Sequence, residues 1–223
     1  MVSLLLLIVC SLSLVTVASA EAIKSRAAVV MDAVTGKVLY GKNPEDCLMP
    51  ASTTKLMTAL VVLENAQLGD VVTVSRRAAN TSPTKVGLKE GDKVTIETLL
   101  YAALIKSAND AAVALAEAVA GSEEEFVKLM NRKALAIGTD NTRFINATGF
   151  PGKGQYTTAY DLSKIMRQAI QYPVLKKILN TRVAKVSTQS GKTIFIKTTN
   201  SLLWSDEDIA GGKTGRRKRD GSI

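Results

Sequence analysis

The sequence contains no histidine, and this absence excludes several classes of enzyme at once. Its 223 residues also include only two cysteines and one tryptophan. Without histidine there can be no Ser-His-Asp triad, no Cys-His dyad and no His-ligated metal site. Two cysteines are too few for a Cys₄ zinc site or an iron–sulfur cluster. We therefore expect no metal and no cofactor, and a catalytic serine would need a base other than histidine.

Charged side chains are absent from the first twenty residues. The stretch from Leu4 to Val17 is largely apolar, and it is followed by Ala18-Ser19-Ala20, the small-x-small pattern of a signal-peptidase site. This pattern predicts a signal peptide over residues 1–20 and a protein exported to the periplasm or cell wall. An N-terminal membrane anchor is the alternative, although the apolar run is shorter than the ~20 residues of a spanning helix.

The rest of the chain has the composition of a globular, basic protein. Hydrophobic residues make up 46%, charged residues 22%, and the net charge is +9. A basic surface suits peripheral association with an anionic cell envelope. A nucleic-acid partner is not expected, because aromatic residues are only 4% and export argues against it. Cys47 would be the one cysteine left after export, and we expect it to be a small half-buried residue.

Hydrophobic periodicity and turn residues predict an α+β fold for residues 21–215. Strands come first, a block of helices follows, and strands end the chain, which suggests an antiparallel sheet assembled from both chain ends. The expected strands are 27–31, 37–40, 71–74, 182–186 and 193–197, and the expected helices are 52–63, 95–105, 110–119, 122–138, 158–171 and a short one from Pro173.

Ser52 and Lys55 form the first candidate catalytic pair. They are three residues apart at an expected helix start, so their side chains lie on one face. The N–H groups of a helix N-terminus favour a developing negative charge there. A lysine can serve as the base if burial and a second cation lower its pKa. This spacing is common by chance and carries little weight alone.

Two more motifs strengthen the assignment. Ser107-Ala108-Asn109 falls between two expected helices, and Lys213-Thr214-Gly215 follows a Gly-Gly pair. The order S-x-x-K, S-x-N and K-T-G is the motif set of penicillin-recognising serine enzymes. Residues 30–40, 50–58, 148–162 and 199–203 fit the same pattern. From about residue 27 to 215, the chain resembles the D-alanyl-D-alanine carboxypeptidases, which are low-molecular-mass penicillin-binding proteins.

The resemblance implies a β-lactamase/DD-peptidase-like fold and a set of catalytic roles. Ser52 would attack the carbonyl between two D-alanines of a peptidoglycan pentapeptide and become an acyl-ester. Lys55 would accept its proton, and Ser107 would relay a proton to the leaving D-alanine. β-Lactam antibiotics would act as inhibitors.

The resemblance also implies the residues that bind the substrate. Asn109 would hold the amide of the acyl side chain, and Lys213 and Thr214 would bind the terminal carboxylate. Lys213 would also lower the pKa of Lys55. Gly215 would allow close approach, and the N–H groups of Ser52 and Arg216 would form the oxyanion hole.

A β-lactamase of the same superfamily shares these motifs and remains an alternative. A class A enzyme needs a glutamate to activate the deacylating water. Residues 138–150, where we look for it, contain Asp140 but no glutamate. The sequence therefore ranks the β-lactamase second.

The end of the chain departs from the family pattern. Arg216 and Arg217 follow Lys213-Thr214-Gly215 where the family has another residue and then usually threonine or serine, and a basic tail covers 216–223. The family continues with two more strands of the sheet. We expect these last two strands to be missing here through a frameshift or an incomplete gene. On that view the chain has little activity or is a non-catalytic relic.

Overall fold

The computed structural model describes residues 23–215 of the chain. The expected signal peptide over residues 1–20 and the basic tail over residues 216–223 lie outside the described residues. No helix between residues 23 and 215 combines the length and the apolar character needed to cross a membrane.

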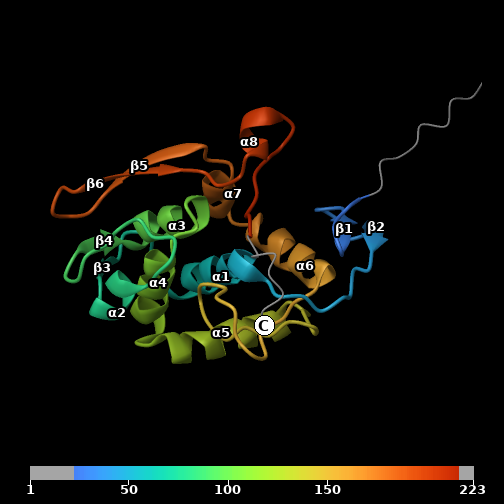
Figure 1. Cartoon of the computed structure of the whole chain (residues 1–223), viewed down its shortest axis with the longest axis horizontal. Helices are drawn as coiled ribbons and strands as arrows, with labels where there is room; N and C mark the ends of the chain where they lie inside the picture. Colours follow the sequence, from blue (N-terminus) through green and yellow to red (C-terminus); the bar gives the residue numbers. More distant parts are fainter. Residues whose placement is uncertain (1–22, 216–223) are drawn as a thin grey trace, which may run out of the picture.

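A block of helices surrounds one buried helix, α1 (Lys55–Asn65), whose residues 55–62 are all buried. Its apolar residues on every side explain this burial, because a helix without a polar face belongs in a core. The helices packed around it are α3 (Ile96–Ile105), α4 (Asn109–Ala120), α5 (Glu123–Ala136) and α6 (Ala159–Ala169) (Figure 1). The shorter helices are α2 (Arg76–Asn80), α7 (Pro173–Leu179) and α8 (Leu202–Ser205).

Side-chain caps define where three of the main helices begin. Thr95, Ser122 and Thr158 each accept a hydrogen bond from the backbone N–H three residues later, and these bonds begin α3, α5 and α6. Such caps satisfy N–H groups that have no partner within the helix. The helix starts predicted at Ser122 and Thr158 are thereby confirmed.

The strands form three separate antiparallel pairs. They are β1 (Ala28–Met31) with β2 (Val38–Lys42), β3 (Val71–Thr73) with β4 (Lys93–Thr95), and β5 (Val183–Ser187) with β6 (Thr193–Lys197). The hairpins predicted at either end of the chain are confirmed. The prediction that both ends share one sheet is wrong for residues 23–215.

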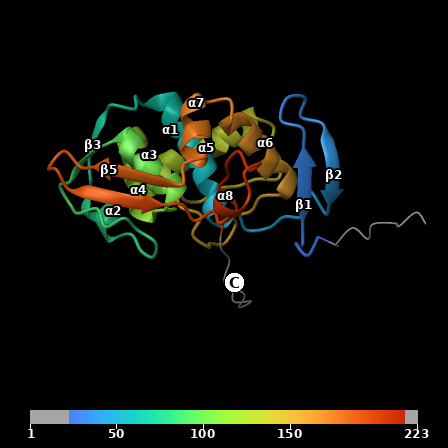
Figure 2. The ribbon, with the colours of Figure 1, turned by 90° about the horizontal axis from the view of Figure 1, so that it is seen from above.

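The separation of the end hairpins follows from what each packs against. β1 lies against α6, whereas β5 and β6 lie against α3, so the helix block stands between them (Figure 2). Residues 211–215 form no strand. The absence of two strands after this segment stays a prediction.

Smaller differences concern short elements and one side chain. The helix expected from Ser52 begins at Lys55 and is preceded by a 3₁₀ turn, η1 (Ala51–Thr54). The sequence pattern did not indicate α2, β4 or α8, because elements of three to five residues carry almost no periodicity. Cys47 is exposed rather than half-buried.

Candidate active site

Ser52 and Lys55 lie at the junction of η1 and α1. Ser52 is in the 3₁₀ turn and Lys55 is the first residue of α1, with Lys55 Nζ 3.5 Å from Ser52 Oγ. The preceding Ala51 has a φ of 46°, a conformation that costs energy for any residue with a Cβ. Strained backbone of this kind is common where a nucleophile is held in place.

The Lys55 side chain is fully buried and held by two carbonyl oxygens. Nζ donates to Asn109 Oδ1 at 2.7 Å and to the backbone oxygen of Thr148 at 2.6 Å. Burial lowers the pKa of Lys55 to about 7, and the positive charge of Lys213 adds to this effect. Near neutral pH a large fraction of Lys55 is therefore a free amine, the form that can accept a proton.

Ser107 lies in the sharp break between α3 and α4, where the sequence places it. Lys213 Nζ donates to Ser107 Oγ at 3.0 Å. The S-x-N and K-T-G motifs, more than one hundred residues apart in sequence, therefore meet at this hydroxyl.

Asn109 is the first residue of α4, and both ends of its carboxamide are engaged within the protein. Oδ1 accepts from Lys55, and Nδ2 donates to the backbone oxygen of Pro83 at 2.6 Å. Asn109 thus fixes Lys55 in this structure. Nδ2 carries a second N–H, which can donate to the substrate amide that the resemblance implies while the first stays bonded to the oxygen of Pro83.

Lys213, Thr214 and Gly215 lie beside the Ser52 turn. Burial lowers the pKa of Lys213 to about 8. Thr214 Oγ1 lies 2.7 Å from Thr199 Oγ1. A Cβ on Gly215 would be 3.4 Å from the carbonyl oxygen of Pro50, so this segment packs against the turn that carries Ser52. Arg216, the expected second oxyanion donor, lies outside the described residues.

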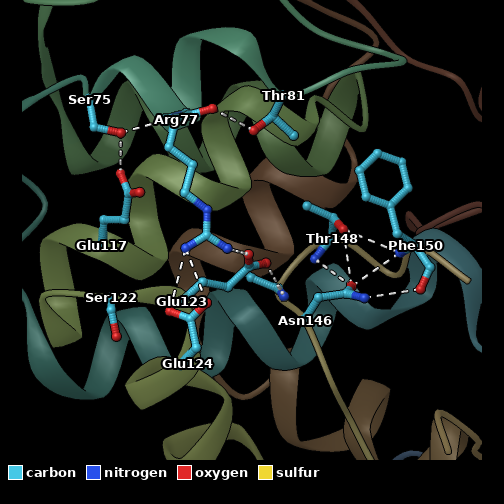
Figure 3. Close-up of polar contacts among 12 residues, drawn as sticks. Ser75, Arg77, Thr81, Glu117, Ser122, Glu123, Glu124, Asn146, Thr148 and Phe150 are labelled. Carbon is cyan, nitrogen blue, oxygen red and sulfur yellow. Dashed lines mark hydrogen bonds and ion pairs between the residues drawn. The ribbon is translucent and has the colours of Figure 1, made fainter. Parts of the chain in front are cut away.

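The sequence did not indicate that the turn over residues 146–150 would contribute a group to the site. The turn over residues 146–150 supplies the Thr148 oxygen that accepts from Lys55, and Asn146, Thr148 and Phe150 hydrogen bond to one another within it (Figure 3). The signal in the sequence was Asn146, because Asn side chains bond to N–H groups two residues on in turns.

The model of the family described as D-alanyl-D-alanine carboxypeptidase matches residues 14–222. The chain belongs to this family. It is 37% identical over 197 residues to D-alanyl-D-alanine carboxypeptidase DacF of Bacillus subtilis, covering 86% of this chain and 51% of DacF. It is 36% identical over 208 residues to DacC of Escherichia coli, covering 88% of this chain and 51% of DacC.

The fold is similar as well. The crystal structure of D-alanyl-D-alanine carboxypeptidase from Mycobacterium tuberculosis superimposes with a TM-score of 0.81 at 32% identity, covering 86% of this chain and 73% of that one. The predicted DD-peptidase-like α+β class is thereby confirmed. The chain spans about half the length of the curated relatives it matches.

Proposed function

We propose that this protein is a serine-type D-Ala-D-Ala carboxypeptidase that removes the terminal D-alanine from peptidoglycan stem peptides. The observation that carries the proposal is the pairing of Ser52 Oγ with a buried lysine whose pKa is lowered to about 7. Family membership supports the reaction, and it favours this reading over the β-lactamase. Asp140, the acidic residue considered for that alternative, is exposed.

In the acylation step, the Ser52 hydroxyl proton passes to the Lys55 amine as Oγ attacks the carbonyl carbon between the two D-alanines. The C–N bond breaks, and the departing nitrogen takes a proton relayed through Ser107. D-Alanine leaves, and an ester on Ser52 remains. Water then hydrolyses this ester, which releases the shortened peptide and returns the proton to Ser52.

The remaining groups would bind the substrate and the transition state. The ammonium of Lys213 and the hydroxyl of Thr214 would hold the terminal carboxylate, and Asn109 the acyl-side amide. The backbone N–H groups of Ser52 and Arg216 would stabilise the oxyanion. β-Lactams would acylate the same serine. We place this chemistry outside the cytoplasm, on the strength of residues 1–20, and we place the basic surface against the cell envelope.

The test is acylation by a fluorescent penicillin, followed by peptide mapping and an assay of D-alanine release from a pentapeptide ending in D-Ala-D-Ala. We expect the label on Ser52 and none on the Ser52→Ala variant. Lys55→Ala should slow labelling by ~10²–10⁴, the usual effect of losing a general base. Thr53→Ala, one residue from the nucleophile, is the matched control and should still be labelled. A label on any other residue would overturn the assignment.

A further inference from the structure

The side chain of Asn146 organises the turn that contacts Lys55. Its Oδ1 accepts from the N–H groups of Thr148 at 3.2 Å, Gly149 at 2.7 Å and Phe150 at 3.1 Å, and from the Thr148 hydroxyl at 3.0 Å. Its Nδ2 donates to the Phe150 oxygen at 3.0 Å. One carboxamide therefore fixes three consecutive peptide units (Figure 3).

The same turn is docked onto the rest of the site. Thr58 Oγ1, on α1, donates to the Ala147 oxygen at 2.8 Å, and the Ala147 N–H donates to Glu123 Oε1 at 2.9 Å. Glu123 is in turn paired with Arg77 at 2.6 Å (Figure 3). These contacts hold the turn at Ala147, while Asn146 sets the direction of the carbonyl of Thr148, the next residue.

That direction decides where the Lys55 amine can accept a proton. A neutral amine has two N–H groups and one lone pair. The N–H groups have two acceptors, Asn109 Oδ1 at 2.7 Å and the Thr148 oxygen at 2.6 Å, while Ser52 Oγ lies farther away at 3.5 Å. With both N–H groups engaged, the lone pair is left for the Ser52 hydroxyl.

We propose that Asn146 is a positioning residue that fixes the Thr148 carbonyl and so aims the lone pair of Lys55 at Ser52. The proposal rests on the proposed function for its catalytic consequence. Its structural part, the control of Lys55 by Asn146, stands on the hydrogen bonds alone. Asn146 does not touch the reacting atoms.

The charged groups around Lys55 indicate in which direction its pKa should change when the Thr148 oxygen is displaced. Lys213 is the charge that acts on Lys55. On the helices packed against α1, the buried acidic side chains have partners: Asp110 bonds to backbone N–H groups, Glu123 to Arg77, and Asp161 to Asn141 N and Thr142. The charged residue of α3, Glu97, is exposed. Losing the Thr148 oxygen removes an acceptor from the ammonium form, so the pKa of Lys55 should fall.

The experiment compares Asn146→Ala, Asn146→Asp and Asn131→Ala with the wild type. Asn131 is the matched control, because it anchors the same segment at Phe144 through two bonds of 2.9 Å but does not contact the turn. The Lys55 titration is read directly by NMR of ¹³C-labelled lysine, assigned by its loss in Lys55→Arg. The rate of acylation by penicillin is measured across the same pH range, and thermal unfolding confirms that each variant is folded.

For Asn146→Ala we expect the Lys55 titration to move to lower pH by about one pH unit. We also expect its maximal acylation rate to fall roughly 10–100-fold through misplacement of the amine. Asn146→Asp keeps the Oδ1 acceptor, loses the Nδ2 donor to Phe150 and adds a negative charge, so it should recover part of the rate and move the titration to higher pH. Asn131→Ala should lose stability without moving the titration.

Equal Lys55 titrations in the wild type and both Asn146 variants would overturn the inference, as would an equal shift in Asn131→Ala. An expected NMR shift together with no acylation of the wild type at any pH would support the positioning by Asn146 and refute the proposed function instead. An unfolded Asn146→Ala leaves the decision to Asn146→Gln, which keeps the carboxamide but displaces its oxygen from the turn. Its Lys55 titration must then move to lower pH, and an unmoved titration would overturn the inference.

Discussion

A Cβ atom on Gly149 would lie 1.8 Å from the carbonyl oxygen of Ala51. Gly149 has a φ of 84° and Ala51 a φ of 46°, so two left-handed residues meet backbone to backbone. Ala51 immediately precedes Ser52, and Gly149 immediately follows Thr148, the acceptor of Lys55. The backbone that carries Ser52 and the backbone that supplies an acceptor to Lys55 are therefore packed directly against each other.

Gly149→Ala should reduce both stability and acylation. Overpacking against a fixed carbonyl costs about 1–3 kcal/mol, and an alanine at this φ adds about 1–2 kcal/mol. The turn must move away from Ala51, which also displaces the Thr148 oxygen. Chemical unfolding measures the first effect and the penicillin acylation rate measures the second.

Gly138→Ala is the matched control for this substitution. Gly138 has a φ of 70°, but a Cβ there would meet nothing within 4 Å. Gly138→Ala should lose only the stability that a positive φ costs an alanine, and its acylation rate should equal that of the wild type. Equal losses in the two variants would show that the contact with Ala51 is unimportant.

The rate of acylation should have a bell-shaped dependence on pH. Ser52 needs the neutral amine of Lys55, so the rate should rise as pH increases through about 7, where burial places the pKa of Lys55. In the proposed function Lys213 binds the carboxylate as an ammonium, so the rate should fall above about 8, where burial places the pKa of Lys213. Stopped-flow labelling from pH 5 to 10 gives both limbs. A rate that is independent of pH through the neutral range would contradict the role of Lys55.

Lys213→Gln should move the acidic limb of that profile to higher pH. Removing a positive charge stabilises the ammonium of Lys55 and raises its pKa. The shift should be partial, because burial lowers the pKa of Lys55 more than Lys213 does. Lys177→Gln, an exposed lysine on α7, should leave the limb in place. If the acidic limb lies at the same pH in the wild type and in Lys213→Gln, the two lysines are not electrostatically coupled.

The sequence pointed to the candidate side chains of the site but not to every group that contacts them. Four candidate residues could be identified because the three sequence motifs contain them: Ser52, Lys55, Ser107 and Lys213. The Thr148 oxygen could not, because it is a backbone atom that any residue would supply. Asn146, through its tendency to bond to nearby N–H groups, is a sequence signal for that turn.

The local sequence pattern could not predict how the strands are arranged into sheets. The hairpins of β1–β2 and β5–β6 follow from alternation and turn residues, so both were predicted correctly. Which hairpins join into one sheet depends on contacts between distant segments. Here β1 packs against α6 and β5 against α3, and neither contact has a signature in the strand sequences.

Asp110 provides the last prediction, because it supports the S-x-N motif from inside the core. Its fully buried carboxylate accepts from the N–H groups of Val86, Gly87 and Leu88 at 3.0 to 3.2 Å. The neighbouring Asn109 also bonds to this loop, through the oxygen of Pro83. Asp110→Ala leaves the loop donors without a partner and should lower the free energy of unfolding by roughly 2–4 kcal/mol.

The same change should slow acylation by about tenfold or more, because a loosened Pro83 oxygen no longer holds Asn109 against Lys55. Asp32→Ala is the control: Asp32 also accepts from turn N–H groups, those of Val34 and Thr35, but in the exposed turn between β1 and β2. Water can replace that carboxylate, so stability should change less and acylation should stay at the wild-type rate. Unfolding by urea and labelling by penicillin at 20–25 °C, where both variants remain folded, compare the two. An Asp110→Ala variant that is less stable but labels at the wild-type rate would limit Asp110 to a structural role.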